Sequence, residues 1–311
     1  MTMADPEEAI EFDPSDFPAC PICGTDRWLL KHSGPVRDGA YGRSVSSSIR
    51  SCAGCGVERL AEGACLESVA YREDTYRRHV GQDHDIGRHY ASHDELALFT
   101  LQTIWPTSLR GKRVADVGCG GGSLLDHMRG LPEQIVAVDP AEGFAQSLIS
   151  RGYRWFPTVG KAAEEFAGQI DVAFAIQVIK HVDDPREFLD SIRSLLKPDG
   201  QCVVSTPNRA DILMELLPDA FPAFFYRTQH RWAFDADSLS ACARAAGFHV
   251  DSVRHVHRYG MANSLLWLRD KKPSGRSSLE AIDGSADALW RMWLESTGRA
   301  DNLYLILRAP S

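Results

Sequence analysis

From about residue 111 onward, short apolar runs alternate with amphipathic stretches. Strand-like runs lie around Val114, Ile135, Arg154, Val172 and Val203, and helical patterns separate them. Such alternation of strand and helix predicts parallel pairing, with helices on both faces of one sheet. We therefore expect an α/β fold for this part of the chain.

The clearest helix is predicted after Asp184. Asp184 can cap the segment PREFLDSIRSLL, Pro185 occupies its first turn, and apolar residues recur on one face. The segment DADSLSACARAAGF predicts another helix, ending at Gly247, and FHVDSVRHV and NLYLILRA predict the last two strands. Residues 258–301 form a long tryptophan-containing insertion between these strands, and insertions of this length are usually functional or lie at interfaces.

The first 110 residues follow other patterns. Residues 1–16 are acidic, interrupted by proline and poor in large apolar side chains, which predicts a disordered tail. Residues 17–60 contain two Cys-x-x-Cys knuckles with room for a hairpin between them, made of RWLLKHSG and SVSSSIRSC. Residues 61–110 turn helical and predict a connector that can act as a lid, with Tyr71, Tyr76 and Tyr90 as candidates, although aromatic residues at this spacing often only pack.

Each knuckle is closed by a glycine, which permits the tight turn that points both thiolates at one ion. Four thiolates in this arrangement predict a tetrahedral, closed and therefore structural Zn²⁺ site, formed by Cys20, Cys23, Cys52 and Cys55. The alternatives are two disulfides or unligated cysteines. His89 and His93 lie four residues apart, but no acidic partner supports a metal site there.

Composition limits the class of protein. With 311 residues and 44% hydrophobic content, the chain can bury one large core plus a small module. A net charge of -8 argues against a partner bound through its phosphate backbone, such as nucleic acid. No run approaches the roughly 18 apolar residues of a membrane span, and the acidic N-terminus is unlike a secretion signal, so we expect a cytoplasmic protein.

The run VADVGCGGGSLL carries the strongest chemical signal. Gly118, Gly120 and Gly122 follow an apolar strand and precede a helix. Glycine there allows positive φ angles and close approach of a ligand, while the helix start offers free N–H groups. Ser123 stands where the dinucleotide fingerprint requires glycine. The next strand ends in Asp139, where a carboxylate can accept both hydroxyls of a ribose. These features predict a nucleotide cradle that is not a NAD site.

Together with Asp116, these glycines form the pattern D-x-G-x-G-x-G, and the ordered segments DVAFAIQVIKHVDDPREFL and LKPDGQCVVSTPN follow. This combination resembles the class I S-adenosylmethionine-dependent methyltransferases, in particular bacterial enzymes that carry an N-terminal four-cysteine zinc-binding module and modify sugars or other small molecules. The resemblance implies a Rossmann-like seven-stranded sheet whose last strand is antiparallel, plus a small N-terminal zinc ribbon. Two departures are Lys180, where such enzymes usually have an acidic residue, and Asp199, which replaces a loop glycine.

The resemblance also implies the cofactor contacts. Asp116 would meet the ammonium group, the glycines would approach the amino-acid and ribose parts, and Asp139 would bind the ribose hydroxyls. The segment GKAAEEF would present a residue to the adenine edge. The expected set is Asp116, Gly118, Gly120, Gly122, Asp139, Pro140, Ala162 and Gln177.

The acceptor side depends on fewer signals. His181 follows the fourth strand of the sheet, at the edge where ligands bind, and its imidazole can act as a general base. A role in holding the loop is the alternative. His230, in an aromatic segment, is the second catalytic candidate. We expect Asn208, Tyr226 and Trp232 to form an acceptor wall, or else to pack a helical cap.

These observations predict methyl transfer from S-adenosylmethionine to the O, N or C atom of a small polar acceptor. The expected acceptor is a sugar or nucleotide-sugar, in glycan or secondary-metabolite biosynthesis. One alternative is RNA base methylation, because some RNA methyltransferases also begin with a zinc ribbon; it would require a basic stripe. The other is a non-catalytic interaction protein that uses the cysteine module to bind a partner.

Overall fold

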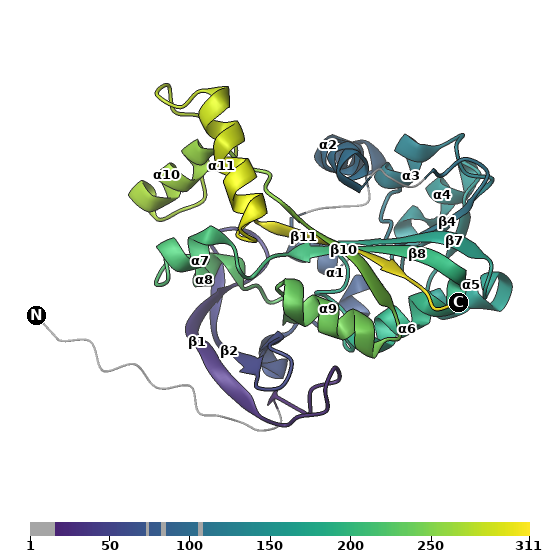
Figure 1. Cartoon of the computed structure of the whole chain (residues 1–311), viewed down its shortest axis with the longest axis horizontal. Helices are drawn as coiled ribbons and strands as arrows, with labels where there is room; N and C mark the ends of the chain where they lie inside the picture. The colour runs from purple at the N-terminus through teal and green to yellow at the C-terminus, as the bar shows by residue number, and fades with distance from the viewer. Residues whose placement is uncertain (1–15, 73–74, 82–84, 105–107) are drawn as a thin grey trace, which may run out of the picture.

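The computed structural model describes residues 16–72, 75–81, 85–104 and 108–311, and the expected N-terminal tail lies outside them except for Asp16. Two β-sheets organise the described chain, one of four strands and one of seven (Figure 1). Within the described residues, no helix combines the length and apolar character needed to cross a bilayer.

The larger sheet has the strand order β10-β11-β8-β7-β4-β5-β6. All neighbouring pairs are parallel except those of β11, which runs antiparallel to both β8 and β10. The predicted seven-stranded sheet with an antiparallel last strand is therefore confirmed. Its strands are β4 (Arg113–Val117), β5 (Gln134–Val138), β6 (Arg154–Phe156), β7 (Ile170–Ile176), β8 (Leu196–Pro207), β10 (His249–Val256) and β11 (Asn302–Arg308).

Helices cover both faces of this sheet (Figure 1). Because side chains alternate along a strand, each face of the sheet forms its own core with the helices that cover it. In β4, Val114 packs with one helical layer and Ala115 with the other. The first layer contains α2 (Ile86–Ile104), α3 (Ser123–Met128) and α4 (Ala145–Ser150). The second contains α5 (Val159–Phe166), α6 (Pro185–Leu195) and α9 (Ala236–Ala245).

Local sequence signals account for the ends of α6. The Asp184 side chain accepts hydrogen bonds from the backbone N–H groups of Arg186 and Glu187, and Pro185 occupies the first turn, as predicted. Strand β8 begins immediately after the helix. Within it, Asp199 has a φ of 59°, in the left-handed region that glycine adopts most easily. Aspartate tolerates this region better than most residues do, which explains why it can replace the loop glycine.

The smaller sheet contains strands from two distant parts of the chain. β1 (Trp28–Arg37) and β2 (Ser44–Cys52) form the predicted antiparallel hairpin, and β3 (Glu58–Leu60) pairs with β2. The fourth strand is β9 (Trp232–Ala233), which follows the large-sheet strand β8 by some distance in sequence and pairs with β3. The segment around residues 226–233 thus joins the N-terminal module to the rest of the chain.

The remaining helices complete the described chain. The segment 258–301 contains α10 and α11, which project beyond the edge of the large sheet in Figure 1. Trp267 of α10 and Leu294 of α11 pack with Phe221 in a separate small core. The helices not given above are η2 (Glu62–Ala64), η3 (Ser68–Tyr71), α1 (Thr75–His79), η4 (Glu142–Phe144), α7 (Ile212–Leu216), α8 (Pro222–Phe225), α10 (Met261–Asp270) and α11 (Gly284–Ser296).

A buried carboxylate connects the two sheets. Glu58 on β3 is only 4% exposed and accepts hydrogen bonds from Tyr226 Oη at 2.8 Å and Arg209 Nη1 at 2.9 Å. Arg209 also contacts Asp235, the N-cap of α9. Each buried charge thus has an opposite charge or a hydrogen-bond donor, as burial requires.

Replacing Glu58 tests this connection. In Glu58→Ala, the hydroxyl of Tyr226 and one face of Arg209 lose their partner inside the protein, so we expect the free energy of unfolding to fall by roughly 3–5 kcal/mol. The matched control Tyr226→Phe removes a single hydrogen bond and should cost about 1 kcal/mol. Urea unfolding measures both. Equal effects of the two changes would contradict the role of Glu58.

Candidate active site

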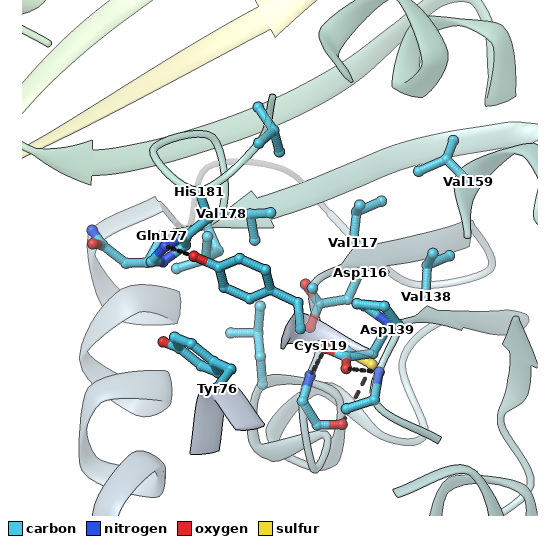
Figure 2. Close-up of a pocket in the computed structure, with 18 of the residues that line it drawn as sticks. Tyr76, Asp116, Val117, Cys119, Val138, Asp139, Val159, Gln177, Val178 and His181 are labelled. Atoms are coloured by element: carbon cyan, nitrogen blue, oxygen red, sulfur yellow. Dashed lines mark hydrogen bonds between the residues drawn. The ribbon is translucent and has the colours of Figure 1, made fainter. Parts of the chain in front are cut away.

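A cavity of about 550 Å³ opens at the carboxyl ends of β4, β5 and β7. Residues of η3, α1 and α2 line its other side. Figure 2 shows Asp116, Cys119 and Asp139 together in one part of the cavity, with Gln177 and His181 in another. The cavity therefore lies at the sheet edge where open α/β folds bind ligands.

The glycine loop has the backbone conformation that its sequence predicts. Gly118, Gly120 and Gly122 have φ angles of 81°, 52° and 88°. A Cβ on Gly118 would lie 2.3 Å from Cγ2 of Val178, so a side chain there would collide with its neighbour. Gly118 and Gly120 line the cavity, whereas Gly122 is the N-cap of α3.

Two buried carboxylates stand beside this loop. Asp139 accepts hydrogen bonds from the backbone N–H of Gly120 at 2.7 Å and of Ala141 at 2.9 Å, which fastens the loop to the end of β5. Asp116 also lines the cavity. Burial, together with the nearby charge of Asp139, raises the pKa of Asp116 to about 8. A cationic ligand group would therefore find a carboxyl group whose ionised form it can stabilise.

Gln177 and Pro140 line the cavity, but Ala162 does not. The segment expected to present Ala162 as a loop forms helix α5 instead, and Ala162 lies fully buried on its inner face. The lining residues from this part of the chain are Thr158, which caps the helix, and Val159. The position of Ala162 therefore does not fit the expected contact with adenine.

Gln177 adopts a φ of 64°, and its side chain is held on both sides. Its amide Nε2 donates to Ser205 Oγ at 3.3 Å and to Asn302 Oδ1 at 3.0 Å, while its Oε1 accepts from Lys180 Nζ at 2.7 Å. These contacts fix the turn that follows β7. This turn presents His181 to the cavity.

The surroundings of His181 define its protonation. Its Nδ1 lies 2.6 Å from the carbonyl oxygen of Gln229 and 3.2 Å from Tyr71 Oη. Because a carbonyl only accepts, Nδ1 carries the proton and the lone pair is on Nε2. Burial, followed by the positive charge of Lys180, lowers the pKa of His181 well below its usual value. The imidazole is neutral at pH 7.

An aromatic group surrounds this histidine. The Tyr71 and Tyr76 rings lie 4.7 Å apart, and their distances from the His181 ring are 5.4 and 5.9 Å. The His230 ring packs edge-on against His181 at 5.1 Å. The chain thus brings the two histidines expected to be catalytic together, although only His181 is among the residues that line the cavity.

The three side chains expected to form an acceptor wall lie elsewhere. Asn208 is fully buried and donates to the carbonyls of Gly298 and Ala300, Tyr226 donates to Glu58, and the Trp232 indole donates to the carbonyl of Val182. None of them lines the cavity. The expectation of an acceptor wall from Asn208, Tyr226 and Trp232 is therefore corrected. Trp232 packs because it joins the small sheet in β9, and the Tyr226 carbonyl accepts the backbone N–H of Arg37 in β1. Asn208 forms an isolated bridge with Phe234.

Sequence reasoning missed His89 and Arg77 as parts of this cavity. His89 Nε2 accepts the backbone N–H of Gly121 at 3.2 Å, and burial lowers its pKa to about 3, which keeps it neutral for this task. Arg77 stacks over the Phe144 ring, with its guanidinium carbon 4.1 Å from the centroid. Both residues line the cavity. Helical periodicity could not reveal that α1 and α2 fold back onto the glycine loop.

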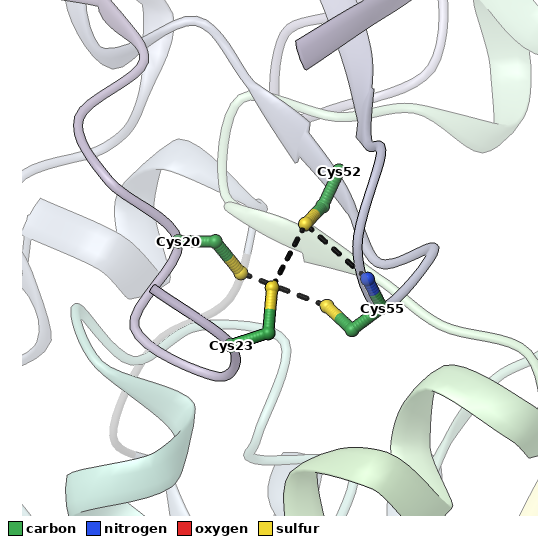
Figure 3. A group of neighbouring side chains, drawn as sticks. All are labelled: Cys20, Cys23, Cys52 and Cys55. Carbon is green, nitrogen blue, oxygen red and sulfur yellow. Dashed lines mark hydrogen bonds between the residues drawn. The ribbon is translucent and has the colours of Figure 1, made fainter. Parts of the chain in front are cut away.

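The four cysteines of the knuckles converge, as Figure 3 shows. Their sulfur atoms all lie within 4.8 Å of one another, with Cys20 and Cys55 at 3.6 Å and Cys23 and Cys52 at 3.4 Å. All four are free thiols. This arrangement fits the donor set of a closed tetrahedral metal site, and it differs from the alternative of two disulfides.

Comparisons with known proteins bear on this geometry. The family model described as "Methyltransferase domain" matches residues 88–253. A ubiquinone biosynthesis O-methyltransferase from Ruegeria sp. (strain TM1040) is 32% identical over 179 residues, which cover 50% of this chain and 66% of that protein. One of the same name from Pseudomonas aeruginosa (strain LESB58) is 30% identical over 164 residues, covering 47% and 68%.

The chain thus spans about two thirds of the length of these relatives. Among solved structures, a SAM-dependent methyltransferase from Thermotoga maritima, described as a possible histamine N-methyltransferase, is 20% identical with a TM-score of 0.48, covering 76% of this chain and 98% of its own. Since the family model covers more than half of the 311 residues, the chain belongs to the methyltransferase domain family and is an S-adenosylmethionine-dependent methyltransferase.

Proposed function

We propose that this enzyme methylates a hydroxyl group of a small polar acceptor, with a sugar or a nucleotide-sugar as the acceptor that we expect. The observation that carries this proposal is the neutral His181 at the cavity, with its proton on Nδ1 and its Nε2 able to accept another. The relatives named as ubiquinone biosynthesis O-methyltransferases support oxygen as the methylated atom and make a phenol the second candidate.

The cavity fits the methyl donor. A volume of about 550 Å³ lies within the roughly 300–1,000 Å³ of ligand pockets. Gly118 leaves room that a Cβ would fill, Asp116 can meet an ammonium group, and Asp139 lies where ribose hydroxyls would be expected. The bound donor supplies an electrophilic methyl group on a positively charged sulfur.

The residues at the other end of the cavity would position the acceptor and take its proton. The Gln229 carbonyl holds the imidazole of His181 in one tautomer, so that Nε2 can accept the proton of a hydroxyl group. Tyr71 and Tyr76 offer aromatic faces beside it, which favour a nearby cation such as a sulfonium. Orientation of the two reactants would supply much of the remaining rate enhancement.

Cofactor binding should release a proton through Asp116. With a pKa of about 8, Asp116 is mostly protonated at pH 7 in the free enzyme, and a cationic ligand lowers that pKa by favouring the carboxylate. We expect the affinity for S-adenosylhomocysteine, whose ammonium is the same, to rise between about pH 6.5 and 8. Calorimetry in buffers of different ionisation enthalpy measures the released proton. Asp116→Asn should bind at least about 10-fold more weakly and release none; equal proton release would contradict this role.

The proposed reaction is tested by a screen for S-adenosylhomocysteine release with nucleotide-sugars, simple phenols, amines and RNA. On the best acceptor, His181→Ala should lower kcat by roughly 10²- to 10⁴-fold, while the affinity for the methyl donor stays unchanged. His230→Ala serves as the neighbouring comparison. Full rates with both variants would contradict a general base at this place, and turnover of RNA alone would contradict the acceptor class.

We propose, further, that the four cysteines bind one structural Zn²⁺. Two knuckles from separate turns with convergent sulfurs support this. Purified protein should contain one zinc per chain, and Cys52→Ser should lose the metal and unfold at a lower urea concentration, because metal binding contributes to folding. The isolated core cysteine Cys202 offers a control, since Cys202→Ala should retain the zinc. Full stability without metal would contradict this site.

A further inference from the structure

A histidine of helix α2 reaches the backbone of the glycine loop. His89 is 7% exposed, and its Nε2 accepts the backbone N–H of Gly121 at 3.2 Å. The His89 ring stacks on the His93 ring at 4.1 Å and packs against the Phe144 ring at 5.1 Å. The imidazole is therefore held by two other rings while its Nε2 faces the loop.

The other backbone N–H groups of the loop find their acceptors in β5, at the end of β5 or in the loop itself. These hydrogen bonds are Gly118 to Val138 O at 2.7 Å, Cys119 to Val138 O at 3.2 Å, Gly120 to Asp139 Oδ2 at 2.7 Å and Gly122 to Cys119 O at 2.9 Å. A buried N–H group needs an acceptor, and Gly121 is buried. Gly121 thus takes its acceptor from α2, outside the strands that form the loop.

Close approach of His89 also explains why residue 121 is a glycine. Gly121 stands at a position that the pattern D-x-G-x-G-x-G leaves open, and it is not among the glycines with positive φ. Its backbone conformation therefore does not require glycine. A Cβ on Gly121 would lie 2.5 Å from Cδ2 of His89, a ring that cannot move aside without losing its packing. The extra glycine makes room for the imidazole.

The hydrogen bond to Gly121 fixes the tautomer of His89. An N–H group only donates, so Nε2 must carry the lone pair. Burial lowers the pKa of His89 to about 3, and the neutral ring then has its proton on Nδ1. Among the residues that the structure describes, Nδ1 is buried without a hydrogen-bond partner. The other tautomer would set two N–H groups against each other, so the bond to Gly121 decides which nitrogen is protonated.

We propose that His89 is a positioning residue for the methyl donor, because it holds the Gly121 amide and thereby the glycine loop in the conformation that receives the donor. This inference rests on the part of the proposed function that places the donor against the loop. His89 and Gly120 both line the cavity. The carboxylate of Asp139 holds the Gly120 amide from β5, and His89 holds the next amide from α2. Two successive peptide planes are thus fixed before the donor arrives, which lowers the cost of ordering the loop on binding.

Three variants test the hydrogen bond itself by calorimetry with S-adenosylhomocysteine. His89→Phe keeps an aromatic ring but removes the acceptor, so binding should weaken by about 10-fold. His89→Gln offers an amide oxygen near the place of Nε2 and should restore the affinity to within about 3-fold of wild type. The control His127→Phe removes a contact of α3 with the Asp94 carbonyl of α2 outside the cavity and should bind as wild type does. Turnover with saturating donor should change little in all three, since the acceptor end is intact.

A double-mutant cycle tests the packing of Gly121 on His89. Gly121→Ala should weaken binding of S-adenosylhomocysteine in the wild-type background, because the new methyl group displaces the imidazole. The same change should have a much smaller effect in His89→Ala, where the ring is absent. Thermal unfolding without ligand identifies variants that are folded, and only these enter the cycle.

Amide resonances provide a measurement that does not depend on affinity. Hydrogen exchange at Gly121 should be slow in wild type, faster in His89→Phe and slow again in His89→Gln. Exchange at Gly118 should stay slow in all of them, because its acceptor is the Val138 carbonyl. S-adenosylhomocysteine should shift the resonances of Gly120 and Gly121 in wild type.

The outcomes separate this inference from the proposed function. If S-adenosylhomocysteine binds without shifting the Gly120 and Gly121 resonances, the proposed place of the donor is wrong. If the resonances shift but His89→Phe binds as tightly as wild type, the positioning role of His89 is wrong while the donor site stands. Equal losses in His89→Phe and His127→Phe, or additive effects in the cycle, would likewise overturn the role of His89.

Discussion

The close passage of backbone at Gly118 is the constraint on which the site depends. The end of β4 turns there with a positive φ, and Val178 from the turn after β7 leaves no room for a side chain. The Asp139 carboxylate fixes the next part of the loop by accepting the Gly120 N–H. Three strand ends are thereby held together, and the cavity forms between them.

The second feature that shapes the site is the shared small sheet. β9 is contributed by the segment that follows β8, so the N-terminal hairpin and the methyltransferase sheet are built into one unit. The same segment carries the Gln229 carbonyl that holds His181. The cysteine module is therefore linked through this segment to the carbonyl that holds a histidine of the cavity, although the two are far apart in sequence.

Features that depend on local sequence could be predicted. The Asp184 cap, the glycine loop and the strand pattern follow from short stretches of chain. The two Cys-x-x-Cys knuckles likewise predict that four cysteine sulfurs come together. Features that depend on distant pairing could not. Trp232 pairs as a strand with Arg59, more than 170 residues earlier, which removes it from the acceptor side and buries it. The expected cofactor contact of Ala162 depended on the segment being a loop. The segment forms helix α5, which places Ala162 in the core.

The most direct test of this account is a crystal structure of the enzyme with S-adenosylhomocysteine. The account predicts the ligand over Gly118 and Gly120, with its ammonium at Asp116 and its ribose hydroxyls at Asp139. It also predicts the sulfur on the side of the cavity that His181 faces. A ligand bound elsewhere, or one whose ribose has no contact with Asp139, would contradict the account.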